Sequence, residues 1–549
     1  MDFDLVIVGL GPVGAVAANL AGQRGLKVLA LDKQTEIYDK PRAFGLDHEI
    51  MRILGNIGVA GDIARHVMPY RTSEYHTSGS RVLKRIVAAS PPLPLGWEAN
   101  YVFSQPALEA ALRKKALSLP SVRIELGTQA VATSPIPDGQ QLTLRNAQGA
   151  ERRVSARYVL ACDGGSSTLR SMLGLDMEDL LFDEPWLVVD IMVEPHALDS
   201  LPQTNIQYCE TARPCTYIVG PGRHRRWEFM INEGEAPEAL AQPGAVEKLL
   251  ARWLAPQDYR FWRSAAYRFH ALVLRQWRRD QVFFLGDAAH MTPPFMAQGM
   301  CQGVRDAANL VWKLDMLIKG LAAPELLDSY QEERLPHVRH TTLVTKELGR
   351  VICERDPAKA AERDERMLAD MKAHPEPTVR QSLIPGLSGG FIAAPDLACA
   401  QGELFPQPFV HDAQGKAGLL DEFTGASFRL AVAHDIDLSA LRPAVEDWRQ
   451  ATSLPLALVR LVNGMQSESP CEACDFQERD GVLQRWMAGH GCRIALVRPD
   501  HYVFGACVAS EQAVALLDDL RHRLASGSSH PQPGEPTAQA RKQAEIPPE

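Results

Sequence analysis

The sequence lacks the features that mark secreted, membrane-spanning or nucleic-acid-binding proteins. Its 10 cysteines are scattered over 549 residues and do not show the spacing of a disulfide framework. No uninterrupted apolar stretch is long enough to cross a bilayer, and the apolar start MDFDLVIVGLGPVGAV has neither the basic region nor the cleavage site of a signal peptide. The formal net charge is −9, and no segment is rich enough in Lys and Arg to indicate nucleic acid. We therefore expect a cytoplasmic protein that binds neither membranes nor nucleic acid.

The chain is too long for a single hydrophobic core. A length of 549 residues indicates two or three domains, and 46% hydrophobic with 23% charged residues is typical of a globular protein. Residues 3–8 form a β-branched run that predicts a buried strand, 13–24 predict a helix, and 27–32 predict a second strand. This order predicts a βαβ unit at the start of the chain.

Two later strands and an insertion complete the expected first half. Residues 157–162 and 281–285 each have the pattern of a buried strand that runs into a glycine turn. Between them, four strands without helices between neighbours predict an inserted antiparallel sheet, at residues 186–193, 204–208, 215–219 and 226–231. Helices are expected at residues 106–118, 303–319 and 325–350.

Strands and helices alternate again after about residue 400, which predicts a small α/β domain. Its strands are expected at residues 427–433, 456–462, 493–498 and 502–507, and its helices near 440–451, 481–489 and 510–525. The last residues, SGSSHPQPGEPTAQARKQAEIPPE, have the composition of a disordered tail.

The first predicted turn carries a glycine motif, Gly9-Leu10-Gly11-Pro12-Val13-Gly14. Gly9 permits a tight turn, Gly11 lets the backbone approach a pyrophosphate, and Gly14 lets helix and strand pack closely. The helix that follows presents free N–H groups and the positive end of its dipole. Asp32 ends the second strand, where a carboxylate would accept from a ribose hydroxyl. Together these features predict a dinucleotide site.

Two later motifs narrow the prediction. Residues 161–170 are ACDGGSSTLR, and residues 286–309 are GDAAHMTPPFMAQGMCQGVRDAAN. With these motifs the sequence resembles the class A flavoprotein monooxygenases, the para-hydroxybenzoate and phenol hydroxylase superfamily, from residue 3 to about residue 350. The whole chain is similar to the 3-(3-hydroxyphenyl)propanoate hydroxylases. The C-terminal part resembles the thioredoxin-like domain of the phenol hydroxylase branch, including Arg498-Pro499-Asp500.

The resemblance implies an α/β fold with three units. They are a discontinuous Rossmann-like FAD-binding domain (residues 1–180 and 276–355), an inserted antiparallel-sheet substrate domain (181–275) and a C-terminal thioredoxin-like α/β domain (401–525), with a connection at 356–400 and a tail at 526–549. The resemblance also implies FAD as the cofactor and NADH or NADPH as co-substrate, bound transiently over the same domain.

The cofactor-binding residues follow from the same motifs. They are Gly9, Gly11, Pro12, Gly14, Asp32, Lys33, Arg42, Gln105, Asp163, Gly286, Asp287, Pro294, Gln298, Gly299 and Met300. In the family, the helix after Gln298 points its N-terminus at the pyrimidine edge of the flavin, which favours the anionic reduced ring. Ala297 is a departure, because relatives often have glycine there. Arg170 is interpreted as an ion-pair partner rather than a cofactor contact.

The catalytic residues are predicted from position and chemistry. Asp47 or His48 would accept the proton of a substrate hydroxyl, because a phenolate ring is attacked faster by an electrophilic oxygen. Tyr208 and Tyr217 lie on inserted strands that would cover the substrate ring. A substrate carboxylate would be bound by one of three arginines, Arg213, Arg225 or Arg226.

Cys471 and Cys474 have the spacing of a redox pair or half a zinc site, which His490 and Cys492 would complete. The pair lies in a late polar loop rather than directly after the domain's first strand, so we expect no metal. The C-terminal domain is instead expected to be a packing or dimer element, which makes a homodimer compatible with the sequence.

The function implied is hydroxylation of a phenol ortho or para to an existing hydroxyl, using NAD(P)H, O2 and an FAD C4a-hydroperoxide. Three alternatives stay open. A related oxygenase could act on a polycyclic or heteroaromatic substrate, and a flavin halogenase shares the FAD fold, although no Trp-x-Trp-x-Ile-Pro segment is found. The third alternative is a binding protein that holds FAD without catalysis.

Overall fold

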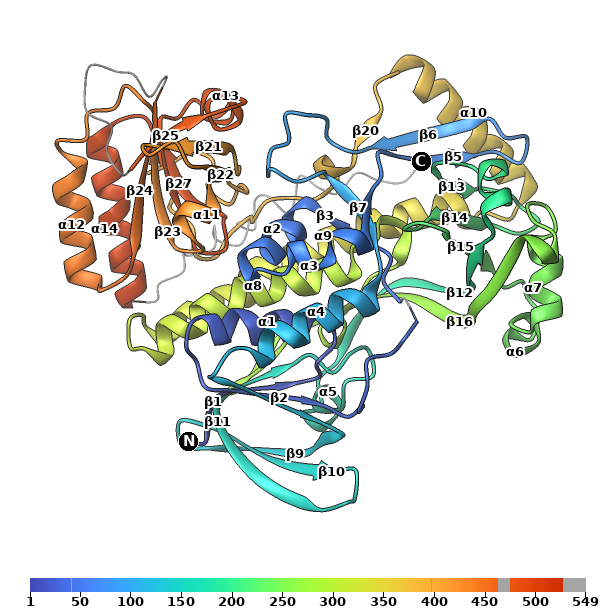
Figure 1. Cartoon of the computed structure of the whole chain (residues 1–549), viewed down its shortest axis with the longest axis horizontal. Coiled ribbons are helices and arrows are strands. Elements are labelled where there is room, and N and C mark those ends of the chain that lie inside the picture. Colours follow the sequence, from blue (N-terminus) through green and yellow to red (C-terminus); the bar gives the residue numbers. More distant parts are fainter. Residues whose placement is uncertain (41, 396, 463–473, 527–549) are drawn as a thin grey trace, which may run out of the picture.

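The structure is a computed structural model that describes residues 1–40, 42–395, 397–462 and 474–526. Three large sheets, each with its own helices, make up the molecule (Figure 1). We call them the parallel sheet, the antiparallel sheet and the C-terminal sheet. None of the described helices combines the length and the hydropathy that a membrane span requires.

The parallel sheet is built around the first strand of the chain, β1 (Phe3–Val8). Its neighbours β2 (Val28–Asp32) and β11 (Glu151–Ala161) both run parallel to it. The strand order is β17-β18-β11-β1-β2-β8, and the remaining strands are β8 (Val122–Leu126), β17 (Arg278–Arg279), β18 (Val282–Phe284) and the hairpin of β9 (Thr128–Ile136) and β10 (Gly139–Asn146). The predicted βαβ unit is therefore present at the start of the chain.

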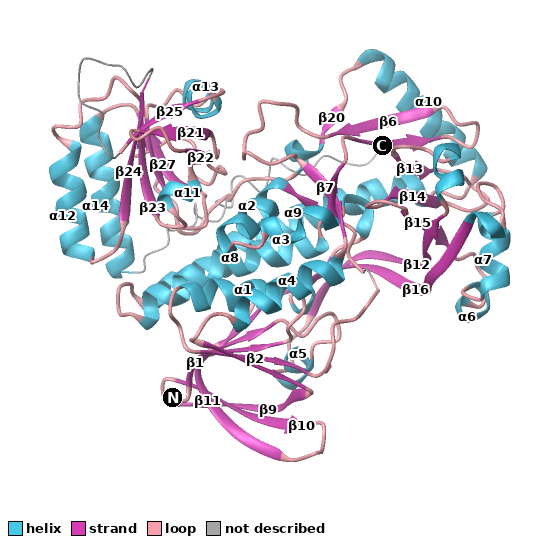
Figure 2. Cartoon of the chain, viewed as in Figure 1, coloured by secondary structure: helices cyan, strands magenta, loops and turns pink. Residues whose placement is uncertain are grey.

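Helices cover one face of the parallel sheet (Figure 2). α1 (Pro12–Gln23) and α4 (Gln105–Leu117) lie directly on the sheet, and α2 (His48–Ile57), α8 (Gly299–Ile318) and α9 (Asp328–Cys353) pack on these helices or on one another. α1 packs against both α4 and α8. Close packing is possible because Gly303 of α8 has no side chain, and a Cβ atom there would lie 2.5 Å from Val13 of α1.

The antiparallel sheet has nine strands in the order β19-β16-β12-β15-β14-β13-β5-β6-β20. The inserted strands are β12 (Met177–Val193), β13 (Asn205–Tyr208), β14 (Cys215–Val219), β15 (His224–Met230) and β16 (Tyr259–Leu274). The other strands come from elsewhere in the chain: β5 (Thr72–His76), β6 (Val82–Val87), β19 (His290–Met291) and β20 (Thr378–Val379). The insertion therefore forms only part of this sheet.

One segment differs from the expectation that it only connects domains, and one small sheet was not expected. Residues 356–400 include the 17-residue helix α10 (Pro357–Ala373) and the strand β20, which pairs in parallel with β6. A small three-stranded sheet of β3 (Gly45–Asp47), β4 (Val67–Pro69) and β7 (Asn100–Phe103) bridges the parallel and antiparallel sheets. These strands are too short to show a clear alternation of apolar residues in the sequence.

The C-terminal sheet contains a βαβ unit, followed by a β-hairpin and a final helix. β23 (Phe428–Val432) and β24 (Leu456–Val462) are parallel and joined by α12 (Leu441–Thr452). β26 (Ile494–Val497) and β27 (Val503–Cys507) are antiparallel and precede α14 (Ser510–Ser526). The other elements are β21 (Phe409–Asp412), β22 (Ala417–Leu419), β25 (Asp475–Glu478), α11 (Asp421–Thr424) and α13 (Val482–Gly489).

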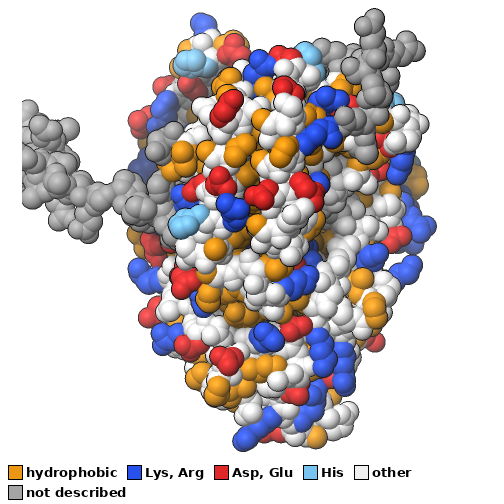
Figure 3. Space-filling model, turned by 90° about the vertical axis from the view of Figure 1, so that its left-hand side faces the viewer, with side chains coloured by type: hydrophobic (Ala, Val, Ile, Leu, Met, Phe, Trp, Pro, Cys, Tyr) orange, Lys and Arg blue, Asp and Glu red, His pale blue; other side chains and the backbone are white. Residues whose placement is uncertain are grey.

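The C-terminal sheet shares a hydrophobic core with α8. Trp312 of α8 lies against Phe428, with ring centroids 5.8 Å apart, and both belong to the cluster that contains Trp448. On the face of the molecule that this domain forms, acidic and basic side chains are interspersed (Figure 3). The shared core fixes the domain against the helical layer.

Candidate functional site

The glycine motif forms the turn between β1 and α1, and its three glycines meet different surroundings. A Cβ atom on Gly9 would lie 2.3 Å from the Cys162 carbonyl oxygen, and one on Gly14 would lie 1.9 Å from the Gly9 carbonyl oxygen. A Cβ atom on Gly11 would meet no protein atom within 4 Å. Pro12 follows as the first residue of α1, so the helix N-terminus opens beside the free space at Gly11.

Asp32 supports this turn from the end of β2. Its Oδ2 accepts from the backbone N–H of Leu10 at 3.0 Å, and the guanidinium of Arg113 lies 3.3 Å from the same oxygen. Arg113 also donates to the Leu10 carbonyl. Lys33 is exposed. Arg113 has no motif of its own in the sequence, and only its place on α4 brings it here.

The Asp163–Gly164 pair forms a second turn, at the end of β11. Asp163 Oδ2 accepts from the backbone N–H of Thr168 at 2.8 Å, whereas Oδ1 is buried without a partner among the described residues. A Cβ atom on Gly164 would meet nothing within 4 Å. Arg170 donates to the carbonyls of Gly165 and Ala288 and so joins this turn to the next one. Its partners are backbone carbonyls rather than the expected carboxylate.

The Gly286–Asp287 turn follows β18. Asp287 is exposed at the surface. The surrounding protein still excludes enough water to raise the pKa of its carboxyl, and the charges of His290 and Arg42 offset part of this increase. Beneath it, buried Asp306 accepts from the Gly286 N–H at 3.0 Å and lies 2.8 Å from His290 Nε2. Asp306 is a positioning residue that the sequence alone does not distinguish from a helix-surface carboxylate.

The loop before α8 presents the helix N-terminus toward these turns. Ala297 has φ 49° and ψ 38°, the left-handed region that favours glycine. Gln298 is fully buried. Its side-chain amide donates to Asp47 Oδ2 at 3.1 Å and accepts from Arg305 Nη1 at 2.9 Å. Gln298 therefore offers only its backbone to a cofactor. Pro294, Gly299 and Met300 are partly exposed around it.

Arg42 and Gln105 lie together at the edge of the site. Gln105 accepts from the backbone N–H groups of Arg42 and Ala43, at 3.2 and 2.6 Å. The Arg42 side chain is 50% exposed and lies 3.4 Å from Glu109. Gln105 thus holds the segment that carries Arg42, and the Arg42 guanidinium stays accessible to an anion.

The predicted bases lie at the start of α2, where Asp47 has a structural role. Its Oδ1 caps the helix by accepting from the N–H groups of Glu49 and Ile50, and its Oδ2 lies 2.7 Å from Arg305. Burial alone would raise the pKa of Asp47, but the charges of Arg305 and His48 and hydrogen bonds from Arg305 and Gln298 lower it to about 2. This geometry does not support proton acceptance by Asp47, because its oxygens already have partners and only 1% of its surface is exposed.

His48 is buried and neutral at neutral pH. Burial and the charges of Arg305 and Arg52 lower its pKa to about 4, and its Nδ1 has no partner among the described residues. Nδ1 is therefore free to form one hydrogen bond, and the tautomer decides whether it donates or accepts. A group with this pKa is a weak base for a phenol near pKa 10.

Tyr208 and Tyr217 point away from the cofactor turns. Both belong to the core on the outer face of the antiparallel sheet, together with Trp227 and Trp253. The Tyr217 hydroxyl donates to the Pro202 carbonyl at 2.9 Å. The expectation that these tyrosines cover the substrate ring is therefore corrected, because their parity along β13 and β14 places them on the opposite face.

The three arginines proposed for a substrate carboxylate all have protein partners. Arg213 is paired with Glu235, Arg225 donates to backbone carbonyls, and Arg226 is bound to Asp190 at 2.8 Å. Only Arg226 lies on the inner face of the sheet, where its guanidinium is 4.6 Å from the Phe44 ring.

A row of polar side chains crosses the inner face of the antiparallel sheet. We call it the polar row, and it consists of Tyr75 on β5, Gln207 on β13, Thr216 on β14 and Glu228 on β15, which pair in register across the four strands. Thr216 donates to Gln207 at 2.6 Å. The Tyr75 hydroxyl is buried without a partner among the described residues. The sequence reasoning missed this row, because it appears only once the register of separate strands is known.

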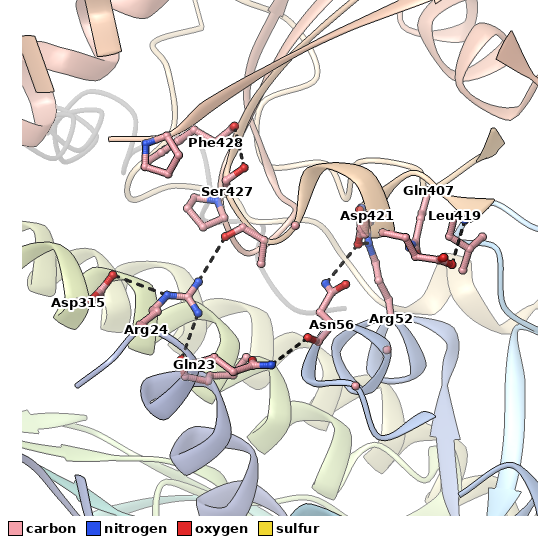
Figure 4. Close-up of a pocket in the computed structure, with 18 of the residues that line it drawn as sticks. Gln23, Arg24, Arg52, Asn56, Asp315, Gln407, Leu419, Asp421, Ser427 and Phe428 are labelled. Atoms are coloured by element: carbon pink, nitrogen blue, oxygen red, sulfur yellow. Dashed lines mark hydrogen bonds and ion pairs between the residues drawn. The ribbon is translucent and has the colours of Figure 1, made fainter. Parts of the chain in front are cut away.

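A hollow of about 810 Å³ lies between α1, α2, α8 and the C-terminal sheet (Figure 4). Arg24, Asn56 and Asp421 are among the residues that line it, and none of the predicted cofactor residues does. Arg52 also lines it and forms a buried ion pair with Asp421 at 2.7 Å. The hollow therefore belongs to the interface between the domains and not to the site of the motifs.

The cysteine prediction falls partly outside the described residues, because Cys471 is not among them. The Cys474 thiol donates to Asp475 Oδ1 at 3.8 Å, and His490 Nδ1 donates to the Trp486 carbonyl oxygen at 2.9 Å. Among the residues that the structure describes, no group of three or more His, Cys, Asp and Glu side chains could hold a metal ion.

The three turns define a flavoprotein. They lie at the carboxyl ends of β1, β11 and β18, neighbouring strands of one parallel sheet, which is where such folds bind dinucleotides. The open space at Gly11 and Gly164, the unpartnered Asp163 Oδ1 and the accessible Asp287 carboxylate all fit a bound FAD.

Comparison with known proteins defines the family. A model described as an FAD binding domain matches residues 2–345, and one described as the HcaD C-terminal domain matches residues 402–523. The chain is 36% identical to a probable NADH-specific resorcinol 4-hydroxylase of Rhodococcus jostii (strain RHA1), over 96% of each chain. It is 29% identical to a 3-(3-hydroxy-phenyl)propionate/3-hydroxycinnamic acid hydroxylase of Comamonas testosteroni, over 94% of this chain and 96% of the relative.

Solved structures share the fold. The flavin-dependent monooxygenase PieE, solved with FAD and substrate, superposes with a TM-score of 0.77 at 18% identity, over 95% of this chain and 99% of its own. Aklavinone-11 hydroxylase gives a TM-score of 0.75 at 20% identity, with the same coverage. The chain belongs to the FAD-dependent aromatic hydroxylases, the class A flavoprotein monooxygenases, and is an enzyme that uses FAD to hydroxylate phenolic rings.

Proposed function

We propose that this enzyme hydroxylates a small neutral phenol, resorcinol or a close analogue, with NADH as the reductant. The observation that carries the proposal is the 36% identity, over 96% of both chains, to a relative whose name states NADH specificity and resorcinol 4-hydroxylation. The match spans the C-terminal domain as well as the motifs, so it concerns the whole enzyme.

The inner face of the antiparallel sheet favours a substrate without a carboxylate. Arg226 on this face is bound to Asp190, and Arg213 and Arg225 are engaged by other protein groups. Glu228 adds a carboxylate to the same face and would repel a second one. A dihydric phenol, in contrast, can donate a hydrogen bond to Glu228 from one hydroxyl. Its hydroxyls can also donate to or accept from Thr216 or Gln207.

Binding of FAD is proposed for the residues at the three turns. The pyrophosphate would lie in the space at Gly11 and the N-terminus of α1, a ribose hydroxyl would donate to Asp32, and Asp287 would accept from the ribityl chain. The N-terminus of α8, after Gln298, would face the flavin ring. When bound, FAD supplies the transfer of electrons from NADH and the activation of oxygen.

We also propose the finer division of the molecule. The first domain would hold FAD (residues 1–180 and 276–355), the insertion 181–275 with its partner strands would cover the substrate, and residues 401–525 would form a thioredoxin-like domain. The succession of β23, α12, β24, β26, β27 and α14 supports the last assignment. The described cysteines outside the Cys471–Cys474 motif are free thiols, which supports a reducing, cytoplasmic location.

The test is a panel of phenols assayed for accelerated NADH oxidation, with products identified by mass spectrometry. The panel contains resorcinol, 3-(3-hydroxyphenyl)propionate, 3-hydroxycinnamic acid and one polycyclic phenol, each with NADH and with NADPH. We expect resorcinol and NADH to give the fastest coupled turnover and a product with one added hydroxyl group. Turnover restricted to the phenylpropanoid acids or to the polycyclic phenol would refute the substrate class. No acceleration with any phenol would refute phenol hydroxylation.

A further inference from the structure

The two faces of β15 have different roles. Trp227 and Phe229 alternate onto the outer face and pack in the core that holds Tyr217. Glu228 lies between them in sequence and therefore points to the inner face. Met230, which shares the parity of Glu228, belongs to the main core together with Tyr75 and Phe295. The inner face thus points at the helical layer and the loop before α8.

Contacts at both ends of this face bring β15 against two loops of the candidate site. Toward one end, Arg226 lies over the Phe44 ring at 4.6 Å, on the segment that leads to Gly45. Toward the other end, Trp186, which pairs with Met230, lies 5.8 Å from the Phe295 ring on the loop before α8. Glu228 is between these ends.

The surroundings of Glu228 leave its carboxylate available. Only 4% of the residue is exposed, and no hydrogen bond to its carboxylate is found among the described residues. The nearest cation is Arg226, whose Nη1 lies 3.9 Å away and which is already bound to Asp190. The next strand supplies neutral Thr216, in register with Glu228. A buried carboxylate without a strong partner is costly, so its presence needs a reason.

We propose that Glu228 is the group that accepts the proton of the substrate hydroxyl, with Thr216 and Gln207 of the polar row orienting the phenol beside it. The inference rests on the proposed function and deepens it. The O–H bond of the phenol breaks, its electron pair stays on the phenolate oxygen, and the proton forms a new O–H bond on the Glu228 carboxylate. The phenolate ring is then more nucleophilic toward the electrophilic oxygen, and Glu228 later returns the proton to solvent.

The charges around Glu228 match this task. Burial raises the pKa of Glu228 to about 7, Arg226 lowers it in part, and Asp190 raises it. Asp190 is itself balanced by Arg226, His224 and Arg263, at 2.8, 2.8 and 3.8 Å. The outer face contributes the buried Cys215 thiol, whose pKa is raised far above neutrality. A base with a pKa close to the working pH is the most effective, because it is partly ionised and still basic.

The test compares Glu228→Gln with the wild-type holoenzyme, using resorcinol, or whichever phenol of the panel gives the fastest coupled turnover. Single-turnover hydroxylation by the reduced enzyme is measured from pH 6 to 9, together with FAD content and the rate of reduction by NADH. We expect Glu228→Gln to keep FAD and NADH reduction, to slow hydroxylation about a hundredfold, and to lose the rise in rate centred near pH 7. Its residual rate should increase toward the pKa of the phenol itself, near 10.

Two further variants control for charge and for side-chain chemistry. Glu247→Gln removes an exposed carboxylate from α7 (Pro243–Leu250) on the outer side of the same sheet and should behave as wild type. Glu228→Asp keeps a carboxylate and should recover part of the rate. Infrared difference spectra between pH 6 and 8 give a readout without turnover, and the band of a carboxyl group that ionises near pH 7 should be absent from Glu228→Gln.

The outcomes separate the two proposals. Wild-type enzyme that no phenol activates would refute the proposed function, and this inference with it. Active wild type with Glu228→Gln equally fast and equally dependent on pH would refute the role of Glu228 alone. Loss of FAD in both Glu228→Gln and Glu228→Asp would show a structural role and would also refute the inference.

Discussion

At the scale of single residues, the three glycines of the first turn show how one motif combines folding with binding. Gly9 and Gly14 are required by the protein itself, because their Cβ atoms would lie 2.3 and 1.9 Å from carbonyl oxygens. Gly11 has no such neighbour, and its φ of −69° is open to any residue. Nothing in the apoprotein explains a glycine there, whereas a pyrophosphate in the empty space does.

We therefore expect Gly11→Val and Gly14→Ala to fail in different ways. Gly11→Val should fold with a free energy of unfolding within about 1 kcal/mol of the wild-type apoprotein, because it loses only a small capping preference. It should contain little FAD. Gly14→Ala should lose more than about 3 kcal/mol, because the clash is with backbone. Flavin absorbance and denaturant unfolding of the apoproteins measure both effects, and a Gly11→Val protein with full FAD content would contradict the assignment.

Which residues the sequence predicts depends on whether their role is local. The glycine triad, the Asp163–Gly164 pair and the Gly286–Asp287 pair are local turns, and the structure brings them to one edge of the parallel sheet. Glu228 and Arg113 act across strands or helices that are far apart in sequence. Their surroundings depend on register and packing, which no window of the sequence contains. The same limit explains why Tyr208 was placed on the wrong face.

At the scale of elements, the loop before α8 packs closely against the strand β3 through two small residues, Ala297 and Gly45. Ala297 occupies a left-handed conformation with φ 49°, and a Cβ atom on Gly45 would lie 2.8 Å from the Ala297 Cβ. The methyl group of Ala297 therefore fills the space that Gly45 leaves empty. Position 297 has alanine where relatives often have glycine, and the facing strand has a glycine, Gly45, opposite it.

A double-mutant cycle tests this pairing. Gly45→Ala alone should cost about 1–3 kcal/mol, because two Cβ atoms overlap and the loop must move. Ala297→Gly alone should change stability by less than about 1 kcal/mol, since relief of the left-handed alanine offsets the added chain entropy. The double variant should be more stable than Gly45→Ala, with a coupling of about 1–2 kcal/mol. Denaturant unfolding of the four proteins measures the coupling, and additive effects would show that the two positions are independent.

Elements with long periodic patterns were the most predictable. The strands and helices expected after residue 400 match β23, α12, β24, α13, β26, β27 and α14 within a few residues. The segment 356–400 was expected to be a connection because its charge and proline content hide α10 and β20. Strands such as β5, with the sequence TSEYH, carry too little apolar alternation to be recognised without their partners.

At the scale of the whole molecule, the C-terminal domain is joined to the helical layer by buried charge as well as by the shared core. Glu333 of α9 receives hydrogen bonds from Arg498 at 2.7 and 2.8 Å, and Arg498 also pairs with Asp500 at 2.6 Å. Lys313 of α8 lies 2.8 Å from Glu333. The stretch Arg498-Pro499-Asp500, singled out in the sequence for its family resemblance, is thus a docking element between domains.

The final prediction concerns this buried network. Arg498→Ala should lower the free energy of unfolding by about 3–5 kcal/mol, because Glu333 and Asp500 would be left buried without their main partner. The exposed pair Arg350–Glu347 is the matched control, and Arg350→Ala should cost less than about 1 kcal/mol.

The Arg498 guanidinium and Lys313 lower the pKa of Glu333 to about 2, below its ordinary value of 4.5. Because a lowered carboxyl pKa stabilises the folded state only while the carboxylate is ionised, the advantage of wild type over Glu333→Gln should be constant above pH 4.5 and shrink toward pH 2. Free energies of unfolding measured between pH 7 and pH 3 for the four proteins test this, and equal costs for Arg498→Ala and Arg350→Ala would mean that the shared core alone holds the domain.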